Sequence, residues 1–249
     1  MTGNGAAGAR PAPPRKTLLA ASILVGLSAT AGSIAFLVWA WPTIPPADAP
    51  PATPGEKLAD GFLLGLIVLQ RAVFSSRAVE IRLHQRLAGC QRALGAFVKG
   101  ALLVLLAVLW IPWNEPGLSR SEALLWFARG AFALGALLHL SATSAVGNDS
   151  LLGFDALRRR ILGLPPDPRP EVARIPLKGP HTRVRHPHAL AVIIMLVSSG
   201  LFARDRLLVA AGGILWLAAS AWAEEARLLR LGGEAYRSYR ARTGFLLPR

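Results

Sequence analysis

The sequence predicts an all-α integral membrane protein: a helical bundle of about six membrane segments that ends in a C-terminal helical hairpin and a cytoplasmic C-terminal helix. Its mean hydropathy is +0.42, and 53% of its residues are hydrophobic. Only 17% are charged, against roughly 25% in a typical soluble domain. The apolar residues gather in six stretches, separated by basic connections. A soluble fold of 249 residues cannot cover this much apolar surface.

The first apolar stretch is residues 17–41, from Thr17 to Trp41, and it follows a cytoplasmic N-terminal tail, residues 1–16. As a helix it is ~37 Å long, more than a bilayer core of ~30 Å requires. We therefore expect the first transmembrane helix here, although Ala47-Asp48-Ala49 leaves cleavage of a signal peptide open. Residues 42–58 follow as a Pro-rich extracytoplasmic linker, because their prolines prevent a continuous helix.

Five further stretches are candidate membrane segments. They run from Asp60 to Phe74, Ala96 to Trp113, Ser121 to Ala145, His188 to Ala203 and Leu207 to Trp222. The stretch from Asp60 is short, and it is also compatible with an amphipathic re-entrant segment. The last two are separated only by Arg204-Asp205-Arg206, which predicts a helical hairpin.

The distribution of positive charge supports this order of segments. Of the 28 Lys and Arg residues, 23 lie in the N-terminal tail, in or around the connection after the second stretch, in the connection after the fourth, and after the sixth. The opposite connections hold only Lys57, Arg120, Arg204 and Arg206, and Arg129 falls inside the fourth stretch. Because basic residues are retained on the cytoplasmic side, the pattern predicts six crossings with both termini cytoplasmic.

Composition disfavours two classes of function. A net charge of +14 could indicate nucleic-acid binding, but aromatic residues are 7% and the basic residues separate apolar stretches, without an RNA- or DNA-binding motif. We therefore expect no nucleic-acid partner. Cys90 is the only cysteine, which excludes an intramolecular disulfide and leaves it without a partner for a thiol-based catalytic or metal motif.

A cluster of bases precedes the fifth stretch, in the sequence GPHTRVRHPHALAVII. Its members are His181, Arg183, Arg185, His186 and His188. Anchoring of the helix end on the cytoplasmic side explains the arginines. It does not explain His186 followed by Pro187: proline suits the first helical turn, and the histidine then lies beside free backbone N–H groups that attract an anion. A metal site of the three histidines is an alternative, but no carboxylate or cysteine completes it.

A second cluster begins where the sixth stretch ends. Glu224-Glu225 lies there, so both ends of the hairpin bring polar residues to one cytoplasmic face. Gly232-Gly233 then interrupts the helix, and Tyr236 and Tyr239 share a helical face after it. A surface ion pair between Glu224 and Arg227 is the simpler alternative, since such pairs are common at this spacing.

Together these clusters resemble the C-terminal pattern of the isoprenylcysteine carboxyl methyltransferase and phospholipid methyltransferase superfamily. The matching residues are Arg185, His186, Pro187, Glu224, Glu225, Leu231, Gly232, Tyr236, Tyr239 and Pro248. Two upstream segments, LQRAVFSSRAVEIRL and GNDSLLGFDALRRRILG, resemble the branch that contains bacterial methanethiol S-methyltransferase and NnrU-type proteins. The resemblance covers most of the chain from about Gly61 onward.

The resemblance implies that residues 59–249 form a membrane methyltransferase-like domain that uses S-adenosylmethionine in a bacterial-type inner membrane. The cofactor is expected in a cytoplasmic pocket beside the last hairpin, and the acceptor, a small thiol or a lipid-like thiol or carboxylate, arrives from the bilayer. The implied cofactor-binding residues are Arg185, His186, Pro187, Glu224, Glu225, Tyr236 and Tyr239. Methyl transfer needs mainly alignment and exclusion of water, so no metal is expected, and no catalytic residue is assigned.

The chain departs from the family pattern at several positions. Ala189 stands where a tyrosine is usual, His181 and Arg183 replace tyrosines, Leu231 replaces a phenylalanine, and Arg71 stands where a histidine is usual. A non-catalytic NnrU-like membrane accessory protein is therefore one alternative. A membrane reductase with a nicotinamide cofactor is another, because steroid-reductase-like proteins share a similar C-terminal arrangement.

Overall fold

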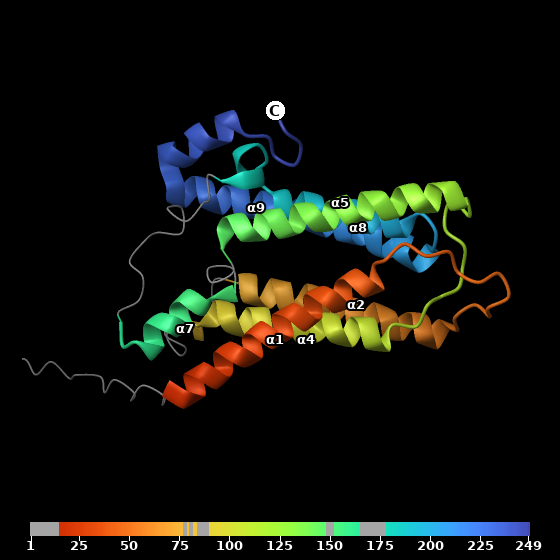
Figure 1. The fold of residues 1–249 in the computed structure, drawn as a ribbon, viewed down its shortest axis with the longest axis horizontal. Coiled ribbons are helices and arrows are strands. Elements are labelled where there is room, and N and C mark those ends of the chain that lie inside the picture. Colours follow the sequence, from red (N-terminus) through yellow and green to blue (C-terminus); the bar gives the residue numbers. More distant parts are fainter. Residues whose placement is uncertain (1–14, 77–78, 80–81, 84–89, 148–151, 165–177) are drawn as a thin grey trace, which may run out of the picture.

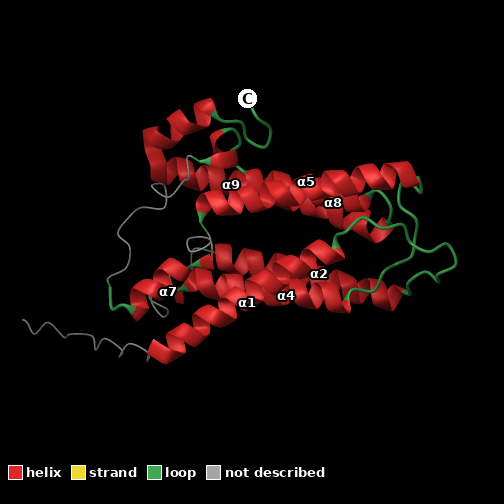
Figure 2. Cartoon of the chain, in the orientation of Figure 1, coloured by secondary structure: helices red, strands yellow, loops and turns green. Residues whose placement is uncertain are grey.

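The computed structural model of the chain describes residues 15–76, 79, 82–83, 90–147, 152–164 and 178–249, which are mostly helical (Figures 1 and 2). The helices are α1 (Arg15–Trp39), α2 (Pro54–Ser75), α4 (Gln91–Leu109), α5 (Glu122–Val146), α7 (Phe154–Ile161), the 3-10 helix η2 (Gly179–Thr182), α8 (Pro187–Gly200) and α9 (Arg204–Arg242). In this part of the chain, extended pairing is limited to two isolated bridges. The all-α prediction is confirmed for these residues.

Four of the described helices are long and apolar enough to span a membrane: α1 from Lys16, α4, α5 and α9. Large apolar side chains cover their outer surfaces, among them Val38, Phe127 and Leu215, which are 72%, 73% and 72% exposed. A surface of this kind suits lipid better than water. α8 has 14 residues, ~21 Å, which is less than the thickness of a bilayer core. The count of six membrane segments therefore stays a prediction.

α2 begins at Pro54, earlier than the predicted Asp60. Thr53 caps it: its hydroxyl accepts a hydrogen bond from the N–H of Glu56, whose carboxylate accepts one from the N–H of Thr53 at 2.7 Å. This reciprocal cap fixes a helix start that apolar periodicity does not reveal. The end of the predicted linker, residues 42–58, therefore belongs to α2. The helix is continuous to Ser75. It is not one of the four helices named above, so its crossing of the membrane stays a prediction beside the re-entrant alternative.

α1 and α4 also begin before the stretches predicted for them. α1 starts at Arg15, so the end of the predicted tail is helical, and residues 1–14 lie outside the described part. α4 starts at Gln91, not at Ala96. Lys99 was counted with the basic connection, although it already falls within the stretch from Ala96; it lies inside α4, ~12 Å along the helix axis from the first residue.

The helices form two layers (Figure 1). In one, α4 packs against α1 and α2, and α7 packs against α1; in the other, α8 packs against α5 and α9. Glycines allow close contacts: a Cβ on Gly100 would lie 2.2 Å from the carbonyl oxygen of Ser28, and a Cβ on Gly135 would lie 3.0 Å from that of Ala191. The Ser28 hydroxyl also donates to the carbonyl of Phe97 at 2.7 Å. Small residues commonly join membrane helices in this way.

The layers are joined at the end of the bundle that lies at the right in Figure 1, where three connections meet; it is here called the loop end. These connections are residues 40–53, 110–121 and 201–203. Nε1 of Trp110 donates to Oδ2 of the buried Asp205 at 2.9 Å, which ties the end of α4 to the start of α9. Trp39 packs edge to face on Trp110 in a core cluster that includes Phe132 of the other layer.

Arg129, the basic residue inside the fourth apolar stretch, also lies at the loop end. Its Nε donates to the carbonyl oxygen of Pro42 at 3.3 Å, and its guanidinium lies 4.9 Å from the ring centroid of Trp126. A cation in an apolar helix requires polar or aromatic partners, and these contacts supply them. Arg129 therefore belongs to the junction of the layers.

α8 and α9 form the predicted hairpin, and the opposite end of the bundle, here called the site end, holds the start of α8. α9 continues past the apolar residues to Gly233, where a φ of 50° and a ψ of −129° break the helix. Glycine adopts such backbone angles without steric penalty. Residues 234–242, here called the C-terminal arm, then turn and lie beside η2 (Figure 1). The predicted interruption and the separate C-terminal helix are both present.

Candidate functional site

Backbone pairing with the C-terminal segment holds the chain ahead of α8. The N–H of Arg185 donates to the carbonyl oxygen of Gly244 at 2.9 Å, and the N–H of His186 donates to that of Phe245 at 3.2 Å. Pro187 then begins α8, at the position where its missing N–H costs no hydrogen bond. The backbone of the Arg-His-Pro motif is thus fixed by residues that lie near the end of the sequence.

Glu225, beyond the apolar part of α9, connects the two motifs. Its Oε1 accepts hydrogen bonds from Nε of Arg185 at 2.8 Å and from the hydroxyl of Tyr236 at 2.7 Å. The same oxygen lies 3.2 Å from Nε2 of His186. The side chains of Arg185 and Glu225 are 7% and 6% exposed. The result is a buried, charge-assisted cluster.

These contacts determine the charge state of the cluster. Burial by itself raises the pKa of the Glu225 carboxyl, but the hydrogen bond from Tyr236, the charge of Arg185 and the remaining donors outweigh burial and lower the pKa. Burial and the hydrogen bond to Glu225 raise the pKa of the Tyr236 hydroxyl. Near neutral pH the carboxylate is ionised and the phenol is protonated. Because Oε1 is used within the protein and Oε2 lies 3.6 Å from Nε of Arg240, Glu225 holds its neighbours in place.

Arg185 and Tyr239 attach the C-terminal arm to the segment before α8. Nη1 of Arg185 donates to the backbone carbonyl of Arg240 at 3.0 Å and to that of Thr243. The hydroxyl of Tyr239 donates to the carbonyl oxygen of His181 at 2.8 Å. Four of the seven predicted cofactor residues are therefore used in contacts within the protein: Arg185, Glu225, Tyr236 and Tyr239.

A cavity of about 160 Å³ lies beside this cluster, between α2, α8 and α9. Its polar lining residues are Arg71, His186, His188, Ser220 and Glu224. The Glu224 side chain is 49% exposed, and its Oε2 lies 4.0 Å from Nδ1 of His186. Of the predicted cofactor residues, His186 and Glu224 line the cavity, and Pro187 sets the start of α8. Arg71 and Ala189, two departures from the family pattern, line it as well.

Sequence reasoning missed two basic residues near this cavity, His139 of α5 and Lys99 of α4. The ring centroid of His139 lies 5.1 Å from that of His188, which in turn lies 5.8 Å from that of His181. Each of the three rings has a buried nitrogen without a hydrogen-bond partner in the described part of the chain. Lys99 is within electrostatic reach of His139 and His188. The signal available in the sequence was an ionisable residue within an apolar stretch.

The metal site considered for His181, His186 and His188 is not formed. Among the residues that the structure describes, no group of three or more His, Cys, Asp or Glu side chains is placed to hold a metal ion. His186 contacts Glu225 instead. Burial lowers the pKa of His181, and a hydrogen bond with the backbone of Ala142 opposes only part of this effect. The neutral imidazole is therefore favoured at His181.

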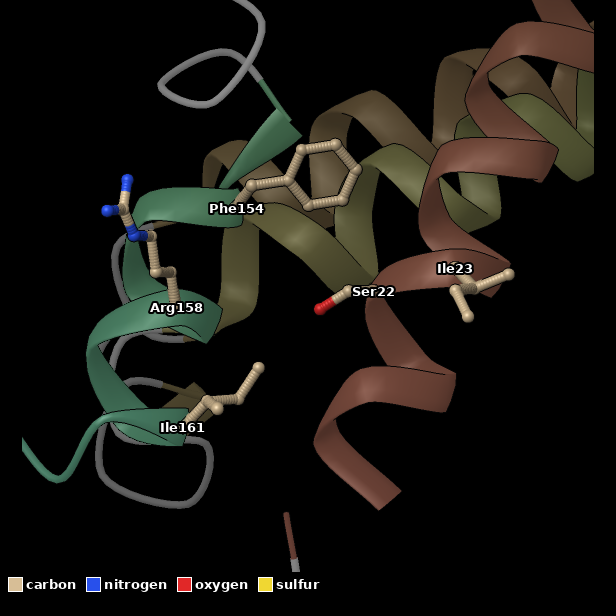
Figure 3. Close-up of a pocket in the computed structure, with 5 residues that line it drawn as sticks. All are labelled: Ser22, Ile23, Phe154, Arg158 and Ile161. Carbon is tan, nitrogen blue, oxygen red and sulfur yellow. The ribbon is translucent and has the colours of Figure 1, made fainter. Parts of the chain in front are cut away.

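A larger cavity, of about 320 Å³, lies away from these residues, between α1 and α7 (Figure 3). Phe154 and Ile161 point from α7 toward α1, which contributes Ser22 and Ile23. The guanidinium of Arg158 points away from α1. This lining is mainly apolar and contains no carboxylate or imidazole. The smaller cavity is therefore the better candidate for a site that binds and reacts with a polar molecule.

The candidate site offers a carboxylate, two imidazoles, a hydroxyl and a guanidinium around one small cavity. Such a set can bind a small molecule that carries both positive and negative charge. Comparison of the chain with family models, with curated proteins and with solved structures finds no match.

Proposed function

We propose that the protein is an S-adenosylmethionine-dependent methyltransferase of a bacterial-type inner membrane, acting on a small thiol or on a lipid-like thiol or carboxylate. The observation that supports this most is the contact of Glu225 with both Arg185 and His186. It unites the two motifs of the family resemblance in one buried cluster next to a cavity. Basic residues that only anchor a helix end have no need of such a cluster.

The proposal includes six membrane segments with both termini cytoplasmic. The six helices α1, α2, α4, α5, α8 and α9 each have one end at the loop end, where basic residues are few. The short α8 packs against both α5 and α9, so neighbouring helices can cover it where it does not reach across the bilayer. The site end then faces the cytoplasm.

The residues at the cavity fit the charges of S-adenosylmethionine. The half-exposed carboxylate of Glu224 can bind its positive sulfonium or ammonium group, and His186 can donate to its carboxylate. Glu225 fixes the ring of His186 from the other side. Bound here, the cofactor would supply an electrophilic methyl group. The contribution of the protein is to align the reactants and to exclude water.

The size of the cavity bears on how a ligand enters. At about 160 Å³ it is smaller than the ~300–1,000 Å³ usual for small-molecule sites. α2 lines it from one layer, while α8 and α9 line it from the other. Because the two layers are tied together at the loop end, we expect α2 to move away from α8 and α9 at the site end when the cofactor binds.

Cofactor binding tests the proposal. Full-length protein in detergent is titrated with S-adenosylmethionine and, separately, with reduced nicotinamide adenine dinucleotide phosphate. We expect saturable binding of the first and none of the second. Binding of the nicotinamide cofactor alone would indicate a membrane reductase, and binding of neither would indicate a non-catalytic accessory protein. Either result contradicts the methyltransferase.

A further inference from the structure

We propose that the cavity at the site end binds an anion through Arg71 and Lys99, and that the molecule methylated there carries a negatively charged group. Both residues lie outside the two C-terminal motifs, on α2 and α4. The statement about a methylated molecule rests on the proposed function, whereas the anion site itself does not.

Lys99 is the first cation of the proposed site. It lies within a 19-residue helix that is apolar enough to span a membrane, where an ionised side chain is costly unless it faces a polar interior. The adjacent Gly100 packs against α1, on a different side of α4. Lys99 is within electrostatic reach of Arg71, His139 and His188, which come from three other helices. Gly95, one turn earlier on the same face of α4, packs against Phe74 of α2 and accepts a hydrogen bond from Nε2 of Gln70 at 3.2 Å. The exposed side chain of Lys99 therefore lies on the side of α4 that faces α2, outside the residues that line the cavity.

Arg71 supplies the second cation. It lines the cavity from α2, and its charge acts on Lys99. Two positive charges in a partly apolar space repel each other, and an anion between them removes the repulsion. Glu224, the acidic residue of the cavity lining, lies against His186. Its carboxylate is therefore placed to bind a positively charged group of the ligand, and it does not neutralise Arg71 or Lys99.

Two histidines supply hydrogen-bonding groups. The rings of His139 and His188 meet at 5.1 Å, and Nδ1 of His139 and Nε2 of His188 are buried without a hydrogen-bond partner in the described residues. Buried polar atoms are nearly always paired, so such atoms beside a cavity point to a bound group. A ring N–H of either histidine can donate to an anionic oxygen or sulfur.

The arginine of the Arg-His-Pro motif cannot take this role. Nε of Arg185 donates to Glu225 and Nη1 donates to backbone carbonyls of the C-terminal segment, and this buried side chain is not among the residues that line the cavity. In contrast, the two departures from the family pattern at the cavity, Arg71 and Ala189, add positive charge and remove bulk. Both changes suit an acceptor with a charged group.

The chemistry is consistent with a carboxylate or thiolate acceptor. The anionic oxygen or sulfur forms a bond to the methyl carbon while the bond from that carbon to the sulfonium sulfur of S-adenosylmethionine breaks. The electron pair of the broken bond stays on that sulfur, which leaves as a neutral thioether. A positive environment also keeps a thiol acceptor in its reactive, deprotonated form.

A pair of probes that differ in charge tests the anion site. 3-Mercaptopropionate and its neutral amide are each titrated calorimetrically into the full-length protein in detergent, and we expect the acid to bind about tenfold more tightly. Arg71→Met and Lys99→Met should each lower the affinity for the acid about tenfold, and they should leave the amide unchanged where the carboxylate is the group recognised. Arg230→Met removes the same charge from an exposed position of α9 outside the lining, and it should bind both probes like the parent.

Propionate and 1-propanethiol, titrated in the same way, tell recognition of a carboxylate from recognition of a thiolate. Lys99→Arg and Arg71→Lys keep the charge and should retain binding of the acid. Equal binding of acid and amide contradicts recognition of a carboxylate, and it contradicts the anion site as a whole if 1-propanethiol does not bind or binds both methionine variants like the parent. Parent-like binding of the acid by both methionine variants also contradicts the anion site.

Titration of the same samples with S-adenosylmethionine separates this inference from the proposed function. Binding of the anion without the cofactor supports the anion site and contradicts the methyltransferase. Binding of the cofactor by a protein whose two methionine variants bind the acid and 1-propanethiol like the parent supports the methyltransferase and contradicts the anion site.

Discussion

Nε of Arg185 donates to Oε1 of Glu225 at 2.8 Å, and this buried pair joins the start of α8 to the part of α9 beyond its apolar residues. The same carboxylate oxygen receives the hydroxyl of Tyr236 from the C-terminal arm and lies next to His186. The pair therefore sets the position of a histidine at the cavity and of the arm that packs beside η2. Loss of this pair should therefore lower the stability of the fold, which can be measured separately from ligand binding.

We predict that Glu225→Gln destabilises the fold by about 3–5 kcal/mol, because it leaves the buried guanidinium of Arg185 without its negative partner. Equilibrium unfolding in detergent micelles measures the change. Glu234→Gln is the matched control: Glu234 pairs with Arg237 on the surface, where its side chain is 80% exposed, so the cost should be within ~1 kcal/mol. Equal costs for the two variants would contradict the buried cluster.

The crossing of α1 and α4 gives a second prediction. Gly100→Ala places a Cβ 2.2 Å from the carbonyl oxygen of Ser28, and we expect it to cost about 1–3 kcal/mol through displacement of the helices. Gly65→Ala on α2 meets no atom within 4 Å, and it should be neutral or stabilise by up to ~1 kcal/mol through helix propensity. Thermal unfolding compares the two. A Gly100→Ala protein as stable as the Gly65→Ala protein would show that α1 and α4 are not in contact there.

The apolar stretches, the C-terminal hairpin and the break at Gly233 could be predicted from the sequence, since each depends on local composition. The start of α2 could also have been predicted, because Thr53 and Glu56 form a capping box that the search for apolar runs passed over. Lys99 was counted with the basic connection although the predicted apolar stretch already began at Ala96, three residues before it. The hydrogen bonds of Leu94 and later residues extend α4 back to Gln91.

The sequence alone could not show which motif residues line the cavity and which are buried. That Glu224 lines the cavity while Glu225 is buried depends on the rotation of α9 about its axis, which neighbouring helices set. The backbone pairing of His186 with Phe245 depends on the angle of the chain at Gly233. His139 was missed because its partners come from other helices.

Stability should depend on pH through His181. Burial lowers the pKa of its imidazole in the folded protein, so below about pH 6.5 the unfolded chain binds a proton more readily than the folded one. The contribution of His181 to the free energy of unfolding is therefore complete above that pH and is lost as the pH falls. Unfolding measured at about pH 7.5 and 5.5 should show a smaller loss for His181→Asn than for the parent. Equal losses would show that His181 is not desolvated in the folded protein.

The topology predicted from positive charge can be tested by fusions. A reporter that is active only outside the cytoplasm should be active when fused after Arg120, in the connection between α4 and α5, and inactive after Arg160 or Arg249. Arg160 follows α5, and Arg249 is the last residue of the sequence given. Activity after Arg160 would contradict both the six segments and the cytoplasmic position of the site.

Whether the two motifs form one cofactor site is tested most directly by the affinity for S-adenosylmethionine of His186→Ala, Glu224→Gln and the double variant, measured by calorimetry with Glu234→Gln as control. Both residues line the cavity, so we expect each single change to weaken binding by about 1–3 kcal/mol, the range for a hydrogen bond to a charged group. Because both act on one ligand, the double variant should lose less than the sum of the single losses. Parent-like affinity in both single variants would contradict the cofactor site and, with it, the methyltransferase.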